Sequence, residues 1–101
     1  MRHMRKIEVV KALRDQEEEW YIEPTLKDGD KKFHYRCAYN ASIRMIINEI
    51  RDSDQSPIVT VENFNSRIYK WLKENPHLQD MYVASIDASD HILDLLNAMD
   101  V

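Results

Sequence analysis

The chain has 101 residues, of which 44% are hydrophobic and 32% are charged, and its formal net charge is -4. This length and composition are those of a globular chain with one hydrophobic core, so we expect a single domain over residues 1–101. The acidic balance provides no overall electrostatic drive toward nucleic acid. Gly29 is the only glycine, which excludes a glycine-rich phosphate loop, a dinucleotide-binding fingerprint and a nucleophile elbow.

Cysteine usage and hydropathy indicate the compartment. Cys37 is the only cysteine, so no internal disulfide can form, which suits a reducing environment. No apolar stretch approaches the length that a membrane-spanning helix needs. We therefore expect a cytoplasmic protein with no membrane association.

The N-terminal part of the chain predicts a helix followed by a hairpin. Over residues 5–19, Ile7, Val10 and Leu13 recur at helical spacing. Residues 20–26 and 33–39 then alternate apolar and polar side chains on either side of the Asp28-Gly29 turn. Alternation around an Asp-Gly pair is typical of a β-hairpin with one buried face. The alternative is a helix that runs from Lys31 into the next segment, which would make the fold an all-α bundle.

Three further helices are predicted in the second half. Asn40 is the predicted N-cap of the first, which carries an isoleucine stripe over residues 43–50 and ends at 52–57. The second begins with Thr60 as its cap and ends near Asn75-Pro76, because proline disfavours helical geometry in the residue before it. Ser85 or Asp87 caps the last helix, after a short apolar segment at 81–84.

These elements predict a mainly helical α+β fold: helix, β-hairpin, then three helices around one core. The predicted core residues are Ile7, Leu13, Phe33, Ile43, Ile47, Ile50, Phe64, Ile68, Leu72, Ile92, Leu95 and Leu96.

Residue types used in catalysis occur together without a convincing arrangement. Ser85, Asp87 and His91 lie in one short window, but capping of the last helix is a sufficient explanation for the serine and aspartate there. On a strand, His34 and Cys37 point to opposite faces and cannot share a metal, and Cys37 is expected on the apolar face. We therefore expect no enzyme activity, no cofactor and no metal site.

The order of the helices around residues 43–75 offers a nucleic-acid hypothesis. A helix, a polar connection and a threonine-capped helix over 61–75 with Arg67, Lys70 and Lys73 resemble the first two helices of winged helix-turn-helix domains. The resemblance implies nucleic-acid binding, with helix 61–75 touching the backbone through Lys70 and Lys73. The helix in the reader position carries aspartates that would repel phosphate. Nucleic-acid binding is therefore the alternative hypothesis.

Protein interaction is the preferred hypothesis. The last helix presents Asp87, Asp90 and Asp94 on one side, and helix 61–75 presents Lys70 and Lys73 with Tyr69 at the flank. Aromatic side chains beyond those needed in a small core are typical of contact surfaces. These six residues predict a small regulatory or interaction module, of an accessory, inhibitor or antitoxin-like kind, that binds another protein or a second copy of itself as a homodimer.

Overall fold

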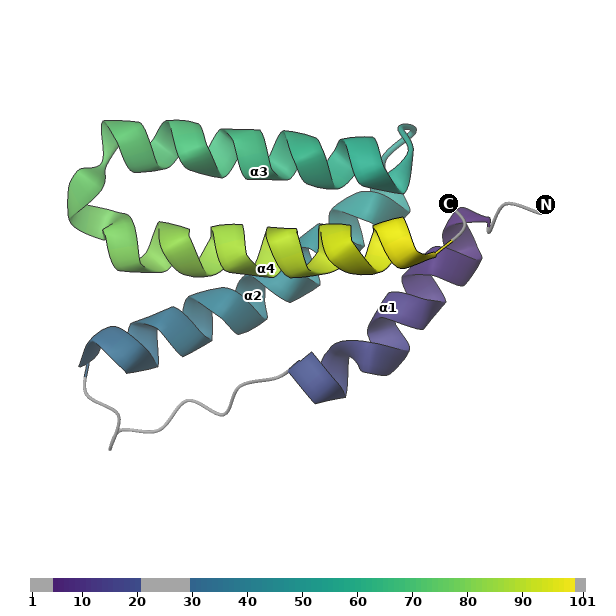
Figure 1. The fold of residues 1–101 in the computed structure, drawn as a ribbon, viewed down its shortest axis with the longest axis horizontal. Coiled ribbons are helices and arrows are strands. Elements are labelled where there is room, and N and C mark those ends of the chain that lie inside the picture. The colour runs from purple at the N-terminus through teal and green to yellow at the C-terminus, as the bar shows by residue number, and fades with distance from the viewer. Residues whose placement is uncertain (1–4, 21–29, 100–101) are drawn as a thin grey trace.

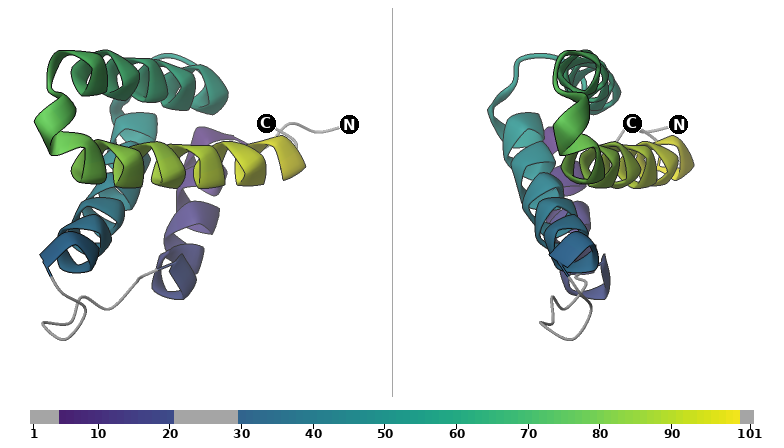
Figure 2. Two further views of the ribbon diagram at one scale, coloured as in Figure 1. Left: turned by 60° about the vertical axis from the view of Figure 1, so that its left-hand side comes forward. Right: turned by 90° about the vertical axis from the view of Figure 1, so that its left-hand side faces the viewer.

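The computed structural model describes residues 5–20 and 30–99. The described residues form four α-helices and one short 3-10 turn, with no strand among them: α1 Lys6–Trp20, α2 Asp30–Asp52, α3 Pro57–Glu74, η2 Pro76–Leu78 and α4 Gln79–Ala98. The helices form two antiparallel pairs, α1 with α2 and α3 with α4 (Figure 1). The two pairs cross obliquely, so that α4 packs against both α3 and α2 (Figure 2). The fold is a helical bundle.

The predicted β-hairpin is therefore wrong. Its second strand, residues 33–39, lies inside α2. Its first strand was predicted to begin at Trp20, which is the last residue of α1, and the rest of that strand and the Asp28-Gly29 turn, residues 21–29, fall outside the described residues. Residues two apart on a helix point to nearly opposite sides, so on α2 the alternating run divides into two faces, and Tyr35 and Tyr39, one turn apart, share one of them. Their rings stack with centroids 6.3 Å apart. Tyr39 lies one turn before Ile43, the first residue of the isoleucine stripe, and packs against the core. Packing of this continuous face favours one long helix.

The core receives apolar side chains from all four helices. Its buried members are Val9, Val10, Leu13, Ile43, Ile46, Ile47, Ile50, Val61, Phe64, Ile68, Ile86, Ala88, Ile92 and Leu96. Eight of the twelve predicted core residues are in this cluster, and Leu72 and Leu95 are only partly buried. Burying this much apolar surface is the main favourable term in folding a chain of this size.

The prediction that Ile7 belongs to the core is wrong. Its side chain is 74% exposed, whereas Val9 and Leu13 are fully buried. Ile7 lies two residues before Val9, which is about 200° around a helix. The helix therefore turns Ile7 away when it turns Val9 and Leu13 toward α2. Phe33, also predicted to be core, is only partly buried near the start of α2.

The start of α3 differs from the predicted cap. Ser56 is the N-cap: its Oγ accepts a hydrogen bond from the Val59 backbone N–H at 3.3 Å, and Pro57 occupies the first turn. Proline is well suited to this position because its missing N–H would have no helical partner. Thr60 is instead a buried helical residue whose hydroxyl donates to the Ser56 carbonyl at 2.9 Å. The helix therefore begins one turn earlier than the Thr60 cap predicts.

The start of α4 is also earlier than predicted. The helix begins at Gln79, directly after η2, so Ser85 and Asp87 do not cap it. Both lie in its interior, and Ser85 is buried. The Ser42 hydroxyl of α2 donates to the Ser85 hydroxyl at 2.7 Å, and Ser85 donates to the Met81 carbonyl at 3.3 Å. The serine satisfies polar groups between packed helices instead of backbone groups at a helix end.

Candidate functional site

The outer face of α4 carries a line of carboxylates. Asp80, Asp87, Asp90 and Asp94 are exposed, and their spacings of seven, three and four residues place them along one side of the helix. The sequence of α4 contains no lysine or arginine that could neutralise them. We call these four residues the α4 stripe. It includes all three aspartates predicted as partner-binding residues.

Two carboxylates of the α4 stripe are held by uncharged donors from neighbouring helices. The Tyr35 hydroxyl of α2 donates to Asp87 at 2.5 Å. The Asn65 side-chain amide of α3 donates to Asp90 at 3.2 Å and to the Ser89 hydroxyl at 2.6 Å. Neutral donors orient a carboxylate without cancelling its charge. The α4 stripe therefore keeps its negative charge at the surface.

The two tyrosines beside Asp87 remain protonated at neutral pH. The pKa of Tyr35 is raised above its ordinary value of 10.0, first because burial disfavours the charged phenolate and second because Asp87 accepts its hydrogen bond and is negatively charged. Burial, followed by the charge of Asp87, also raises the pKa of Tyr39. The Tyr35 hydroxyl is thus available as a donor to Asp87.

The three predicted partner-binding residues of helix 61–75 all lie on the surface of α3. Tyr69 is 53% exposed, and Lys70 and Lys73 are exposed. Tyr69 is one turn beyond Asn65, which contacts α4, so Tyr69 lies on the side of α3 that borders the α4 stripe. The fold thus brings Tyr69 to the same face as the aspartates.

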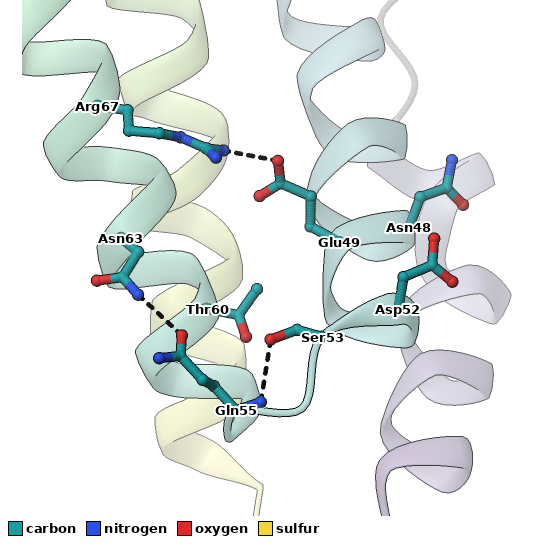
Figure 3. A pocket seen from close by; sticks show the side chains of 8 residues that line it. All are labelled: Asn48, Glu49, Asp52, Ser53, Gln55, Thr60, Asn63 and Arg67. Atoms are coloured by element: carbon teal, nitrogen blue, oxygen red, sulfur yellow. Dashed lines mark hydrogen bonds and ion pairs between the residues drawn. The ribbon is translucent and has the colours of Figure 1, made fainter.

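Arg67 of the same helix is engaged on the opposite flank. Its guanidinium donates to the Glu49 carboxylate of α2 at 2.6 Å and lies 5.5 Å from the centroid of the Phe64 ring. The pair joins α2 to α3 (Figure 3). Of the three basic residues in the nucleic-acid hypothesis, Lys70 and Lys73 are thus the two on the outward part of the helix.

Arg67 borders a polar pocket of about 390 Å³ between the end of α2 and the start of α3, lined by Asn48, Glu49, Asp52, Ser53, Gln55, Thr60, Asn63 and Arg67. Figure 3 shows that several of these side chains pair across it. The Asn63 amide donates to the Gln55 side-chain oxygen at 3.0 Å, and the Ser53 hydroxyl accepts from the Gln55 backbone N–H at 3.0 Å. These hydrogen bonds stabilise the α2–α3 connection, so we interpret the pocket as a structural feature of that connection.

The catalytic residue types between 85 and 91 are directed to different neighbours. Ser85 contacts Ser42 of α2, Ser89 contacts Asn65 of α3, and Asp87 contacts Tyr35 of α2. A hydrolytic triad needs its members within hydrogen-bond reach of one another. Ser85 and Asp87 are two residues apart, about 200° around α4, so the helix turns the serine and the aspartate to different sides.

The cysteine and histidine candidates also change with the fold. Cys37 is exposed, so its predicted place on a buried apolar face is wrong. On α2, His34 and Cys37 are three residues apart and share a side, which the strand prediction did not allow. Among residues 5–20 and 30–99, no group of three or more histidine, cysteine or carboxylate side chains could hold a metal ion.

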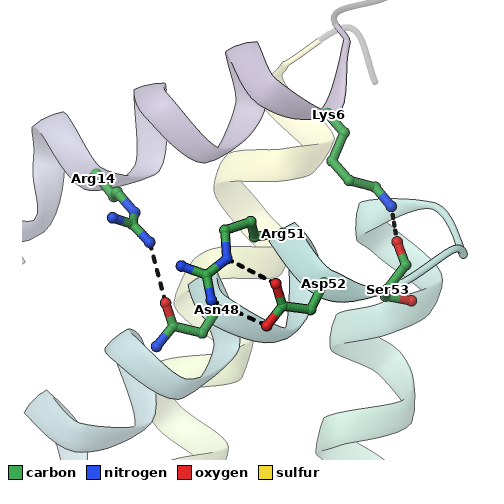
Figure 4. Close-up of polar contacts among 6 residues, drawn as sticks. All are labelled: Lys6, Arg14, Asn48, Arg51, Asp52 and Ser53. Carbon is green, nitrogen blue, oxygen red and sulfur yellow. Dashed lines mark hydrogen bonds and ion pairs between the residues drawn. The ribbon is translucent and has the colours of Figure 1, made fainter.

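One surface was missed by the sequence reasoning. A pocket of about 630 Å³, which we call the α1 pocket, lies along α1 and is lined by Lys6, Ile7, Val10, Lys11, Arg14, Asp15 and Arg51. The sequence pattern for this pocket is Ile7, Lys11 and Arg14 at helical spacing. It was not recognised because Ile7 was assigned to the core. Figure 4 shows Lys6, Arg14 and Arg51 of this region with their partners.

Comparison of the chain with protein-family models, curated proteins and solved structures found no match. Within the part of the chain that the structure describes, every helix is too short or too polar to cross a membrane.

Proposed function

We propose that this chain is a non-catalytic protein-interaction module that binds a cationic surface of a partner protein through the α4 stripe and Tyr69. The observation that supports the proposal most strongly is the unneutralised charge of the stripe: four exposed carboxylates on a helix with no lysine or arginine. Complementary charge across an interface accelerates association and selects the partner. The stripe thus supplies an electrostatic preference for a basic partner.

The contacts of the stripe suit a binding role. Asp87 and Asp90 are oriented by Tyr35 and Asn65 before any partner arrives, so less conformational entropy is lost on binding. Tyr69 adds a large exposed ring at the border of the stripe. Tyrosine is enriched among the residues that carry most of the binding energy in protein interfaces.

The test is partner capture with charge-reversed variants. We expect wild-type protein, used as bait in lysate of the source cells, to retain a partner that Asp90→Lys with Asp94→Lys loses. Glu62→Lys with Glu74→Lys is the matched control, because it makes the same charge change at two exposed acids of α3. The control should retain the partner. In both double variants the free energy of unfolding should differ from that of wild type by no more than about 0.5 kcal/mol per exposed substitution.

Direct binding of the purified partner decides the result. Equal affinity of wild type and the Asp90, Asp94 variant would contradict the proposal. Salt-dependent binding of duplex DNA that is lost in Lys70→Ala with Lys73→Ala would instead favour the nucleic-acid alternative through helix 61–75.

A further inference from the structure

The α1 pocket combines an apolar floor with a basic rim. Ile7 is 74% exposed, the highest value among the large hydrophobic side chains of the described residues, and Val10 beside it is 9% exposed. An exposed aliphatic side chain over a pocket is a site that another apolar group can cover. The floor therefore favours a ligand that has an apolar part.

Four basic residues and one acidic residue, Asp15, line the pocket around this floor. Lys11 and Arg14 lie four and seven residues after Ile7 and so share its side of α1, and Arg51 faces them from α2. Arg14 also lines an adjoining pocket of about 250 Å³ together with Arg44. A protein with a net charge of -4 thus has a concentration of positive charge on this one surface.

Several of these basic side chains are held in place by the end of α2. Lys6 donates to the Ser53 backbone carbonyl, and Arg14 donates to the Asn48 side-chain oxygen at 3.1 Å (Figure 4). Arg51 pairs with Asp52 through two nitrogens, at 2.8 and 3.1 Å. The rim is therefore ordered before a ligand binds, which lowers the entropic cost of binding.

We propose that the α1 pocket docks an acidic amphipathic helix of a partner protein. An apolar side chain of that helix covers Ile7 and Val10, and its carboxylates meet Lys11 and Arg14. The distance along α1 from Ile7 to Arg14 is about 10 Å, or two turns. A partner helix with acidic residues one turn from a central apolar residue matches this spacing.

The chemistry of the pocket favours this ligand over two others. A fatty acyl chain is bound in sites that enclose most of its surface, whereas here the floor consists of only two apolar side chains and one of them is largely exposed. Nucleic-acid phosphates would place charge over the exposed Ile7 without using it. An amphipathic helix uses both the floor and the rim. The chain then bridges two partners of opposite charge, one on the α4 stripe and one on the α1 pocket.

The experiment is fluorescence anisotropy with a labelled synthetic helix of about five turns that carries leucines on one face and glutamates on both flanks. A second peptide has lysine in place of every glutamate. We expect the α1 pocket to bind the acidic peptide, and we expect binding of the lysine peptide only at the α4 stripe, so that Asp90→Lys with Asp94→Lys removes it and leaves binding of the acidic peptide. Lys11→Glu with Arg14→Glu should weaken binding at least about tenfold, and Ile7→Ser about fivefold.

Lys70→Glu with Lys73→Glu is the matched control, because it makes the same charge change on α3, and it should stay within about twofold of wild type. Since Arg14 contacts Asn48, circular dichroism verifies that each variant folds, and Lys11→Glu alone replaces the double variant if that one unfolds. Equal binding of the acidic peptide by wild type and the Lys11 variants, or equal binding of the two peptides by Asp90→Lys with Asp94→Lys, would overturn the proposal. Tighter binding of anionic phospholipid vesicles or single-stranded RNA, lost in the same variants, would also overturn it.

Discussion

The buried hydrogen bond between Ser42 and Ser85 joins α2 to α4, and we predict that replacing either serine alone lowers stability by a different amount. Both side chains are buried, Ser42 donates to Ser85 at 2.7 Å, and Ser85 donates to the Met81 carbonyl at 3.3 Å. The two serines therefore have different roles in the bond. Replacing each by alanine, singly and together, separates the cost of an unpaired hydroxyl from the value of the bond.

The expected magnitudes follow from which group loses its partner. In Ser85→Ala the Ser42 hydroxyl loses its acceptor inside the core, and a buried unpaired donor costs about 1 to 3 kcal/mol. In Ser42→Ala the Ser85 hydroxyl still donates to Met81, so we expect only the net value of one hydrogen bond, about 0.5 to 1 kcal/mol. The double variant removes both polar groups with little change in volume. It should therefore be more stable than Ser85→Ala alone.

The assay is urea unfolding followed by circular dichroism, with thermal melting as a second measurement. For a domain of this size, 1 kcal/mol corresponds to a shift of about 4 to 8 °C in Tm. Ser66→Ala is the control, because Ser66 is exposed on α3 and reports the gain in helix propensity that accompanies any such change. Strictly additive losses in the double variant would contradict the assigned bond between Ser42 and Ser85, since a shared bond requires coupling.

Two further predictions concern the core and Tyr35. Ile92→Ala, at a fully buried position, should lower the free energy of unfolding measured in urea by about 2 to 5 kcal/mol. Ile7→Ala should change it by less than about 0.5 kcal/mol. A loss for Ile7→Ala as large as that for Ile92→Ala would show that α1 is rotated and that Ile7 is buried. Burial and Asp87 raise the pKa of Tyr35 above 10.0 in the folded state, so the native state binds the phenol proton more tightly than the unfolded state does. The resulting contribution to the free energy of unfolding is complete below pH 10.0 and is lost as the pH rises above that value. Tyr35→Phe should flatten the fall in stability above pH 10.0, and an unchanged pH profile in urea titrations would contradict the assignment.

Much of the helical layout follows from local sequence. The isoleucines at 43–50 are at helical spacing and end at a polar segment before Pro57, and Asn75-Pro76 stops α3 next to its observed end at Glu74. Apolar periodicity and proline act over a few residues, so they can be read without knowledge of the fold. The same periodicity placed Asp87, Asp90 and Asp94 on one outer face of α4, as the structure has them.

Tertiary packing decided the elements whose local signals were ambiguous. The alternation of residues 33–39 is a local signal for a strand, but packing of Tyr39 against the core, continuous with the isoleucine stripe, favours the helix. Ser85 has the residue type of a cap, yet it lies inside α4 because Ser42 of α2 satisfies it. The side of α1 that faces α2 depends on Val9 and Leu13 fitting that helix, and this choice leaves Ile7 in the α1 pocket. These outcomes depend on contacts between residues far apart in sequence, which a local pattern does not contain.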